Sequence, residues 1–506
     1  MRRTRARRAA TLLVGLSLVT AAACGGDDDG DTATTSGGAT PTTGGDAATT
    51  AGDATTTEGG DTTEPMDTEP MDTSEDTEPM DTSEDTEPED TSDDTEPEDT
   101  TAGGGSAPAG GGDTEQASPS CTGEADGTLS IATVLPETGS LAFLGPPEFA
   151  GANLAVEDIN AAGGVLGEDV ILDEGDSGDT STDIANQTVD RQLAAGADVF
   201  IGAASSGVSF TFIDKLVENC KIHFSPANTS PDFTDYADDD LYFRTAPSDV
   251  LQGRVLADLM IEDGITNATF IALQDPYGEG LLEFSSGPFG EQGGEIVDSF
   301  TYDPNADNFG PEVERIVSGD PDALVLIGFE ESAQILTTLF ESGFTADQKA
   351  IYLVDGNVGN ALGEQLPPGS LVGVKGTLPQ AELQEDFRTR LLEVDPALID
   401  FSYAAETYDA IIITALAAEL AESDDPALIA AQINGVTRDG TACTTFEECK
   451  ALIEEGEDID YDGPAGPMTF GPQGEPTEAS FAILSYDEAN LAVGGEVETE
   501  YRFAQI

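Results

Sequence analysis

Between residues 128 and 354, apolar residues follow two different patterns of spacing. Short apolar runs bounded by polar turn residues are typical of buried strands. They predict strands at 128–135, 170–173, 198–201, 221–224, 269–273, 296–300, 323–327 and 351–354. Between these runs, apolar residues recur at the spacing of one helix face. This spacing predicts helices at 148–161, 183–194, 209–218, 250–262, 279–292, 311–317 and 332–341.

The order of these elements predicts the fold class. Strands separated by amphipathic helices usually pair in a parallel sheet that has helices on both faces. Two such series follow one another, so we expect an α/β protein with two doubly wound parallel-sheet lobes joined by a multi-strand hinge. Ligands of such sheets bind beyond the carboxyl ends of the strands. The residues that follow each predicted strand are therefore the candidates for a site.

Two serines follow the predicted strand at 198–201. Ser205 and Ser206 lie in the segment 202–207, where the next helix opens. Backbone N–H groups and hydroxyls at the start of a helix can hold a carboxylate. Serines at this position also commonly cap the helix, and that use alone would explain them equally well.

Three more predicted strand ends carry polar or aromatic groups. The polar turn 225–230 follows the strand at 221–224, Tyr277 follows the strand at 269–273, and Asp355 follows the strand at 351–354. Together the strand ends offer donors for an anion, hydroxyls, an aromatic ring and one acid. This combination suits a zwitterion with a carboxylate and an ammonium group.

The first 24 residues are typical of an export signal. Five arginines within residues 2–8 precede an apolar stretch at 9–23, which is shorter than the roughly 20 residues of a membrane span. The stretch ends in Ala21-Ala22-Ala23-Cys24, which resembles a bacterial lipobox, so we expect a lipid on Cys24. Ordinary cleavage after Ala23, which would release a free secreted protein, is the alternative.

Residues 25–120 predict a disordered linker. They contain 28 acids but no Lys, Arg, Val, Leu, Ile, Phe or Tyr, so burial cannot offset the entropy cost of folding. A nine-residue repeat starts at Thr73, Thr82 and Thr91. Because it lacks the glycines of a calcium-binding β-roll, we interpret it as a solvated spacer.

Charge excludes two classes of partner. The formal net charge is −82, of which residues 121–506 carry −59. Nucleic acids and anionic lipid surfaces both require basic residues on the protein, so neither is an expected partner of the folded part.

Cysteine and histidine usage bears on the remaining chemistry. Outside the cytoplasm, an even number of cysteines favours disulfides. Cys443 and Cys449 can close a short loop, which leaves Cys121 with Cys220. No CxxC pair exists and His223 is the only histidine, so neither a zinc site nor another metal site is expected. His223 lies in a predicted strand and no GxSxG or P-loop motif occurs, which disfavours an enzyme.

Residues 126–503 resemble the leucine/isoleucine/valine-type family of ABC-transporter substrate-binding proteins, which have the type I periplasmic-binding fold. Five segments carry the resemblance, in this order: FAGA at 149–152, VEDINAAGG at 156–164, SPANT at 225–229, YG at 277–278 and YDGPAG at 461–466. The resemblance covers nearly the whole predicted α/β part.

The resemblance implies roles for the strand-end residues. Ser205 or Ser206, the Ala227 backbone and the Thr229 hydroxyl would hold a ligand carboxylate, and Asp355 would bind its ammonium group. The walls of the site would be Tyr277 and Phe329 from the second lobe and Leu144 from the first. The family often has an aromatic residue where this chain has Leu144.

We therefore expect three parts: a signal peptide at 1–24, a linker at 25–120 and a solute-binding domain at 121–506. The first lobe would comprise 126–246 and 379–462, and the second 247–378 and 463–506, with three hinge crossings. The expected protein is a monomeric, lipid-anchored, extracytoplasmic component of an ABC importer that needs no cofactor. Its expected ligand is a branched-chain or other amino acid. Short amides, urea, aromatic acids, or a sensing role with the same fold, are the alternatives.

Overall fold

The computed structural model describes residues 118–505. The predicted signal peptide, Cys24 and the predicted linker up to residue 117 lie outside the described residues. Ser120, the last residue of the predicted linker, already donates hydrogen bonds from its backbone N–H and its hydroxyl to Asp239, both at 2.9 Å. The structured part therefore begins slightly before the predicted boundary.

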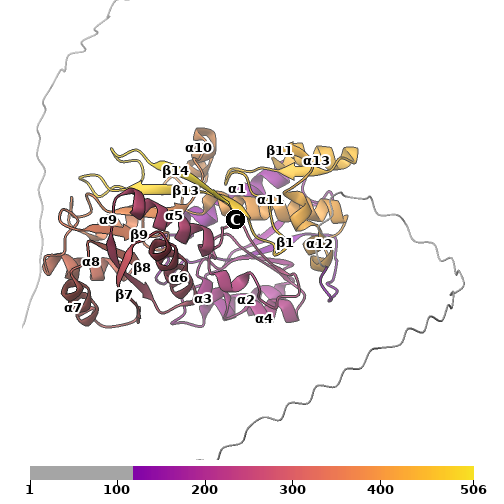
Figure 1. The fold of residues 1–506 in the computed structure, drawn as a ribbon. Helices are drawn as coiled ribbons and strands as arrows, with labels where there is room; N and C mark the ends of the chain where they lie inside the picture. Colours follow the sequence, from indigo (N-terminus) through magenta and orange to yellow (C-terminus); the bar gives the residue numbers. More distant parts are fainter. Residues whose placement is uncertain (1–117, 506) are drawn as a thin grey trace, which may run out of the picture. The chain divides into compact units, whose positions relative to one another are not determined.

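The first sheet consists of five parallel strands in the order β2–β1–β3–β4–β5. Figure 1 shows the whole fold, with β1 labelled in this sheet. Its strands are β1 (Ser130–Val134), β2 (Ile171–Asp173), β3 (Val199–Gly202), β4 (Ile222–Ser225) and β5 (Tyr242–Arg244). The sequence predicted the first four. It did not predict β5, which is only three residues long.

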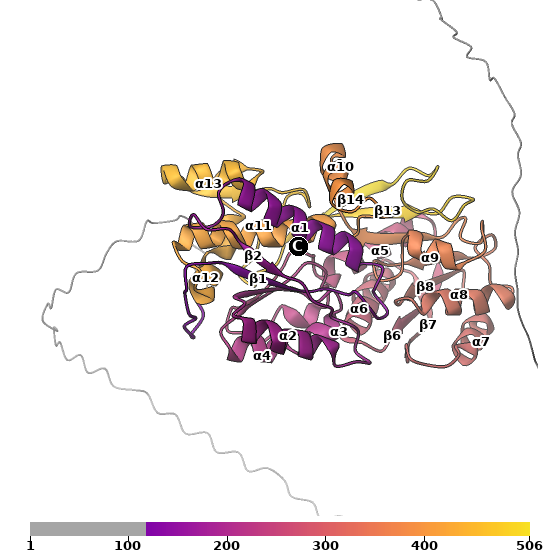
Figure 2. The same ribbon diagram turned by 180° about the vertical axis from the view of Figure 1, so that it is seen from behind.

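Helices cover both faces of this sheet, as Figure 2 shows from behind. Alternate residues of β1 and β3 belong to different hydrophobic clusters: Ile131 and Ile201 pack with α1 and α11, whereas Ala132 and Phe200 pack with α2, α3 and α4. The helices of this lobe are α1 (Gly145–Ala161), α2 (Ile184–Ala195), α3 (Ser206–Ser209), α4 (Ile213–Glu218), α10 (Glu385–Val394), α11 (Ala404–Ala421), α12 (Pro426–Val436) and α13 (Phe446–Glu455), together with the 3₁₀ turn η1 (Pro231–Phe233).

The predicted helix at 209–218 is wrong in its bounds, because the structure contains two short helices, α3 and α4, in this region. The interruption lies at residues 210–212, where Phe212 has φ −134° and ψ −4°, outside the helical region. The side chain of Ser209 accepts a hydrogen bond from the backbone N–H of Ala203 at 3.0 Å, which ties α3 to the end of β3. This tertiary contact is invisible to helical periodicity.

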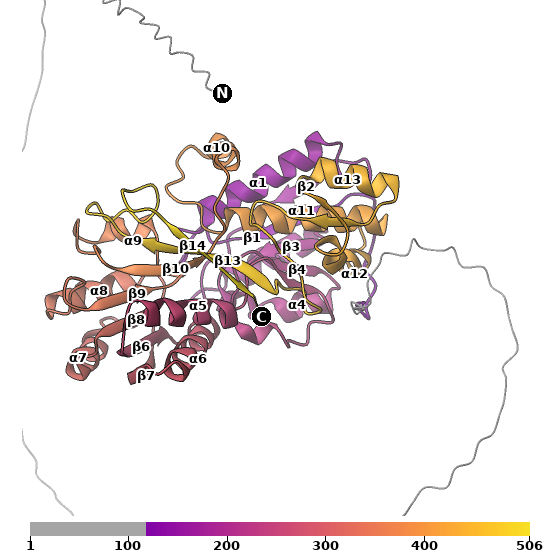
Figure 3. The same cartoon turned by 45° about the horizontal axis from the view of Figure 1, so that its top comes forward.

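The second sheet contains seven strands in the order β14–β13–β10–β9–β8–β6–β7. Its strands are β6 (Asn267–Leu273), β7 (Glu295–Tyr302), β8 (Ala323–Ile327), β9 (Ala350–Leu353), β10 (Lys375–Pro379), β13 (Glu478–Ser485) and β14 (Glu500–Gln505). The five from β6 to β10 are parallel, whereas β13 and β14 add an antiparallel edge beside β10 (Figure 3). The second sheet is therefore mixed rather than purely parallel.

The helices of the second lobe surround one large hydrophobic cluster. They are α5 (Asp249–Glu262), α6 (Pro276–Glu291), α7 (Gly310–Gly319), α8 (Ser332–Glu341) and α9 (Asn360–Gln365). Within the described residues, no helix is both long and apolar enough to span a membrane.

The chain passes between the two sheets after β5, after β10 and before β13. Between the last two crossings lies a small parallel pair, β11 (Thr441–Cys443) and β12 (Ile459–Tyr461). Met468 and Phe470 still pack in the core of the first lobe. The last crossing therefore lies further along the chain than residue 462, the position predicted from the sequence.

Two disulfides hold the first lobe. Cys121 bonds to Cys220 and Cys443 bonds to Cys449, which are the pairs that the sequence predicted. The first ties the start of the described chain to the end of α4, and the second links β11 to α13.

Candidate ligand-binding site

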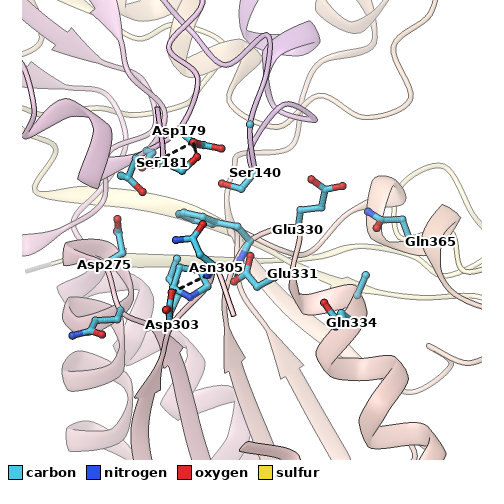
Figure 4. Close-up of a pocket in the computed structure, with 18 residues that line it drawn as sticks. Ser140, Asp179, Ser181, Asp275, Asp303, Asn305, Glu330, Glu331, Gln334 and Gln365 are labelled. Carbon is cyan, nitrogen blue, oxygen red and sulfur yellow. Dashed lines mark hydrogen bonds between the residues drawn. The ribbon is translucent and has the colours of Figure 1, made fainter. Parts of the chain in front are cut away.

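A cleft of about 690 Å³ separates the carboxyl ends of the two sheets. Figure 4 shows Ser140, Asp179 and Ser181 of the first lobe facing Asp275, Asp303 and Glu331 of the second. None of the residues that line this cleft is a Lys or Arg. A smaller cavity of about 100 Å³ adjoins it and shares Ser140, Phe329, Glu330 and Gln365 with it.

The two serines after β3 lie at the first-lobe side of the cleft. Ser205 lines the cleft, and its hydroxyl accepts a hydrogen bond from the N–H of Val208 at 3.3 Å, so it caps α3. Ser206 accepts a hydrogen bond from the N–H of Ser230 at 3.3 Å. Because α3 has only four residues, its start is a poor anion site by itself, and capping accounts for Ser205.

The turn at 225–230 is held rigidly beside these serines. Ser225 donates a hydrogen bond to the carbonyl of Ala203 at 2.8 Å, and the side chain of Asn228 donates to the same carbonyl at 2.9 Å. The N–H of Ala227 donates to the Ser225 hydroxyl at 3.3 Å. Thr229 is 1% exposed, and its hydroxyl makes no hydrogen bond of ordinary geometry. The hydroxyl interacts instead with the buried carboxyl of Asp249 and lowers the pKa of that acid.

Three second-lobe residues of the predicted site contact one another. The rings of Tyr277 and Phe329 stack with centroids 5.5 Å apart, and the Tyr277 hydroxyl donates to Asp355 Oδ1 at 2.8 Å. All three side chains are buried. The predicted aromatic wall and the predicted acid therefore form one unit at the ends of β6, β8 and β9.

Asp355 also binds two residues that the sequence did not single out. Gln252 of α5 donates to Oδ1 at 2.8 Å, and Tyr403, which precedes α11, donates to Oδ2 at 2.7 Å. Burial raises the pKa of Asp355, while these hydrogen bonds act against that rise. Tyr403 has a left-handed φ of 60° at the start of α11, a conformation that no periodic pattern signals.

The lobes contact each other at several points across the cleft. Tyr403 of the first lobe reaches Asp355 of the second, and the Ser230 hydroxyl donates to the carbonyl of Pro276 at 3.1 Å. Gly207 lies so close to Asp275 that an added Cβ would be 2.1 Å from its Oδ2. The two lobes therefore contact each other beside the cleft.

Two further sequence predictions concern Leu144 and His223. Leu144 is 2% exposed within the larger hydrophobic cluster, whereas its neighbour Phe143 lines the smaller cavity. His223 is buried in β4, its Nε2 lies 2.6 Å from the carbonyl of Gly202, and burial lowers its pKa to about 3. A neutral, enclosed imidazole fits the structural role predicted for it.

Comparisons with known proteins agree with this architecture. A family model described as "Periplasmic binding protein" matches residues 128–490. Among curated relatives, the Leu/Ile/Val-binding protein homolog 3 of Brucella melitensis is 26% identical, and the match covers 72% of this chain and 92% of the relative. The chemotactic signal transduction system substrate-binding protein BasB of Halobacterium salinarum is 24% identical, with 72% and 88% covered.

A solved structure shows the same fold. The branched-chain amino acid transporter substrate-binding protein LivJ of Streptococcus pneumoniae, in complex with isoleucine, superposes with a TM-score of 0.60 at 20% identity. The superposition covers 74% of this chain and 99% of that protein.

Proposed function

The chain belongs to the periplasmic binding protein family, and from this premise we propose that it captures an amino acid between its lobes and delivers it to an ABC permease. Members of this family are extracytoplasmic binding proteins rather than enzymes. Branched-chain amino acids are the first ligands to test, because two of the proteins it resembles are named for them.

The observation that carries this proposal is the buried unit of Tyr277, Phe329 and Asp355 in the second lobe, together with the buried Thr229 hydroxyl of the first lobe. The unit supplies an aromatic wall and an acid, and Thr229 supplies a hydroxyl. Charge-assisted hydrogen bonds contribute about 1.5–3 kcal/mol each, and burial of an aliphatic side chain adds about 1.5–3 kcal/mol. A few such terms, less the ordering costs, reach the roughly −8 kcal/mol of micromolar binding.

Contacts from both lobes also explain how binding would be signalled. A ligand held by Thr229 on one side and by Asp355 on the other favours the closed state, because only that state makes both sets of contacts. We propose that the permease recognises the closed surface, and that a lipid on Cys24 keeps the protein at the outer face of the membrane.

A sensing role is the second candidate, and the likeness to a chemotactic substrate-binding protein favours it. The same capture and closure would then be read by a membrane receptor. A pull-down of the liganded protein from solubilised membranes distinguishes the two partners: recovery of a permease supports import, and recovery of a receptor supports sensing.

The first prediction concerns thermal stability in the presence of amino acids. A ligand at about 100 times its Kd adds about 2.7 kcal/mol to the unfolding free energy, which corresponds to a rise of a few degrees in Tm. We expect leucine, isoleucine or valine to give such a shift, and Thr229→Ala and Asp355→Asn to reduce it.

Thr269→Ala is the matched control, because Thr269 is also buried with an unpaired hydroxyl but lies within β6. Its ligand-induced shift should equal that of the wild type. If no amino acid raises Tm, or if the site variants and this control lose the shift equally, the proposed function is wrong.

A further inference from the structure

Glu406 lies where the three crossings between the lobes meet. It is in the first turn of α11, and it lines a small cavity of about 10 Å³. On the wall of this cavity, Thr245 comes from the first crossing and Pro379 from the second. Met468 and Pro476 come from the third. The carbonyl of Glu406 also accepts a hydrogen bond from the Thr245 hydroxyl at 2.9 Å, so Glu406 belongs to the hinge.

The side chain of Glu406 is buried without the partners that a carboxylate needs. It is 4% exposed, and its Oε2 has no hydrogen-bond partner. The cavity beside it has room for no more than about one water molecule. Burying an unpaired carboxylate is costly, whereas the protonated acid carries no charge and has an O–H group that can donate. The enclosed hinge therefore favours the protonated acid.

The titratable groups that face Glu406 are acids and a phenol. Asp409, in the next turn of α11, repels its charge. Glu406 in turn raises the pKa of Glu148 in α1 and of Tyr403, and Glu478 of β13 lines the same cavity. Burial first, and then Asp409, raises the pKa of Glu406 to about 8, while its own backbone N–H opposes that rise. Neither these groups nor the residues that line the cavity include a Lys or Arg, so no basic side chain offsets the charge there.

Movement of the lobes would change the surroundings of Glu406. Lobes that separate must turn about the three crossings, so the segments that enclose this carboxyl move relative to α11. Water then reaches the carboxyl, and hydration favours its charged form. Ligand capture brings the lobes together and favours the enclosed, protonated form.

We propose that Glu406 is a proton-linked hinge switch, in which capture of the ligand is coupled to uptake of one proton by this carboxyl. The proton comes from the solvent and forms the O–H bond of the acid, and it returns to the solvent when the lobes separate. Alkaline pH therefore favours release of the ligand. This inference rests on the proposed function, since it concerns the closure of the lobes around that ligand.

The test measures binding of L-leucine to the full chain by titration calorimetry at pH 7.0 and 9.0. If another amino acid gives a larger thermal shift, that amino acid replaces leucine. A pKa of about 8 in the closed form predicts a Kd about tenfold higher at pH 9.0 than at pH 7.0. Heats in two buffers of different ionisation enthalpy give the protons taken up per ligand, which we expect to approach one at pH 7.0.

Glu406→Gln has nearly the same size and keeps a donor and an acceptor, but it does not ionise. We expect it to lose both the tenfold change in Kd and the uptake of a proton at pH 7.0. Ionisation of leucine itself affects every variant alike, so the comparison with the wild type isolates the hinge carboxyl.

Asp198→Asn is the matched control, because Asp198 is also an acid of the first lobe whose pKa burial raises. It pairs with Lys221 and precedes β3, at the end of that strand away from the cleft. This variant should keep the tenfold change in Kd and the proton uptake of the wild type.

Unfolding of each unliganded variant shows whether it is folded. If Glu406→Gln unfolds, Asp409→Asn replaces it: without repulsion from Asp409 the pKa of Glu406 falls, so the loss of affinity should move to lower pH.

Three results would overturn the inference while solute capture stands. They are a wild-type Kd that does not change between pH 7.0 and 9.0, a folded Glu406→Gln with the proton uptake of the wild type, and an equal loss of uptake in Asp198→Asn. For Asp409→Asn, an unshifted pH dependence has the same meaning. A wild-type protein that binds no amino acid would instead overturn the proposed function, and the inference with it.

Discussion

Arg244 links the first lobe to the last crossing of the chain and holds the turn that carries Thr229. Its side chain is fully buried, it forms an ion pair with Glu475, and it donates to the carbonyls of Asn228 and Ser230 at 3.3 and 2.7 Å. Removing one member of such a buried pair leaves the other charge uncompensated. One residue thus sets both local stability and the position of a proposed ligand group.

At this scale we predict that Arg244→Met lowers the free energy of unfolding by about 3–5 kcal/mol, the usual cost of breaking a buried pair. The double variant with Glu475→Met should lose less than the sum of the single losses, because the two charges disappear together. Denaturant unfolding followed by circular dichroism measures the free energy of unfolding of the wild type, the two single variants and the double variant.

Arg191→Met is the comparison for this prediction, because Arg191 pairs with Asp173 at a partly exposed site. Its loss should stay within about 1 kcal/mol. If Arg244→Met and Arg191→Met lowered the free energy of unfolding equally, burial would not decide the strength of these ion pairs.

The packing of α1 on α11 supports the first lobe and orients Tyr403 toward the cleft. Gly151 lies at the closest approach of the two helices: an added Cβ would be 2.2 Å from the carbonyl oxygen of Ala404, the first residue of α11. That atom is backbone, so a side chain at 151 must push the start of α11 away. Tyr403, next to Ala404, would move with it.

At the scale of elements we predict opposite effects for two glycine substitutions in helices. Gly151→Ala should destabilise the protein by about 1–3 kcal/mol, because overpacking forces a backbone shift. It should also weaken ligand binding through Tyr403. Gly435→Ala, at an exposed position of α12 with no atom within 4 Å of the new Cβ, should stabilise by up to about 1 kcal/mol.

Denaturant unfolding and calorimetric binding measure both effects on the same proteins. The prediction is wrong if Gly151→Ala is as stable as the wild type, or if Gly435→Ala weakens ligand binding as much as Gly151→Ala does.

Burial raises the pKa of several carboxyls in the folded part. Six buried or partly buried groups have raised values: about 6 for Asp198, Asp238, Asp275 and Asp400, about 7 for Asp409 and about 8 for Glu406. Their values in the unfolded chain are about 4. At a pH between its unfolded and its folded pKa, each carboxyl keeps in the folded state a proton that the unfolded state has released.

We therefore predict that the unliganded protein loses stability as the pH rises from about 5 to about 8.5. A raised folded-state pKa contributes stability below the unfolded pKa, and this contribution is lost as the pH passes through the folded pKa. His223 has a pKa lowered to about 3, so below about pH 6.5 it makes the protein more stable as the pH rises. It is one group against six carboxyls. Calorimetric Tm values at pH 5.5 and 8.5 measure the change.

Two controls isolate the buried groups. Measurements in 1 M NaCl screen repulsion between surface charges, so the remaining dependence belongs to buried acids. Glu406→Gln should make the dependence shallower, whereas Glu454→Gln, on an exposed face of α13, should not change it. A Tm that rises with pH under these conditions would contradict the prediction.

Much of the fold could be predicted from the sequence because each element signals its own burial. The eight predicted strands all occur, with bounds within a few residues. Six of them are largely buried and read as continuous apolar runs, whereas β2 and β7 are more exposed. The short strand β5 and the split between α3 and α4 were missed, because tertiary contacts and not local periodicity decide them. The antiparallel strands β13 and β14 were likewise not foreseen.

Some residues of the candidate site could likewise be predicted from the sequence, and others could not. Thr229, Tyr277 and Asp355 could be found because they follow predicted strands, where ligand groups of such folds lie, whereas Phe329 was implied by the family resemblance. Their ligand roles stay predictions. Gln252 and Tyr403 could not be found, since they lie inside or just before a helix and reach Asp355 from other parts of the chain.

The two-lobed α/β plan, the cysteine pairs and the candidate strand ends could all be predicted from residue order alone. Local apolar patterns predict the plan, because burial of each element follows from its own residues, and the short spacing of Cys443 and Cys449 predicts the pairs. Which polar groups lie together in the buried space between the lobes could be seen only in the folded structure. That depends on contacts such as Gln252 with Asp355, 103 residues apart, which arise when separate elements pack.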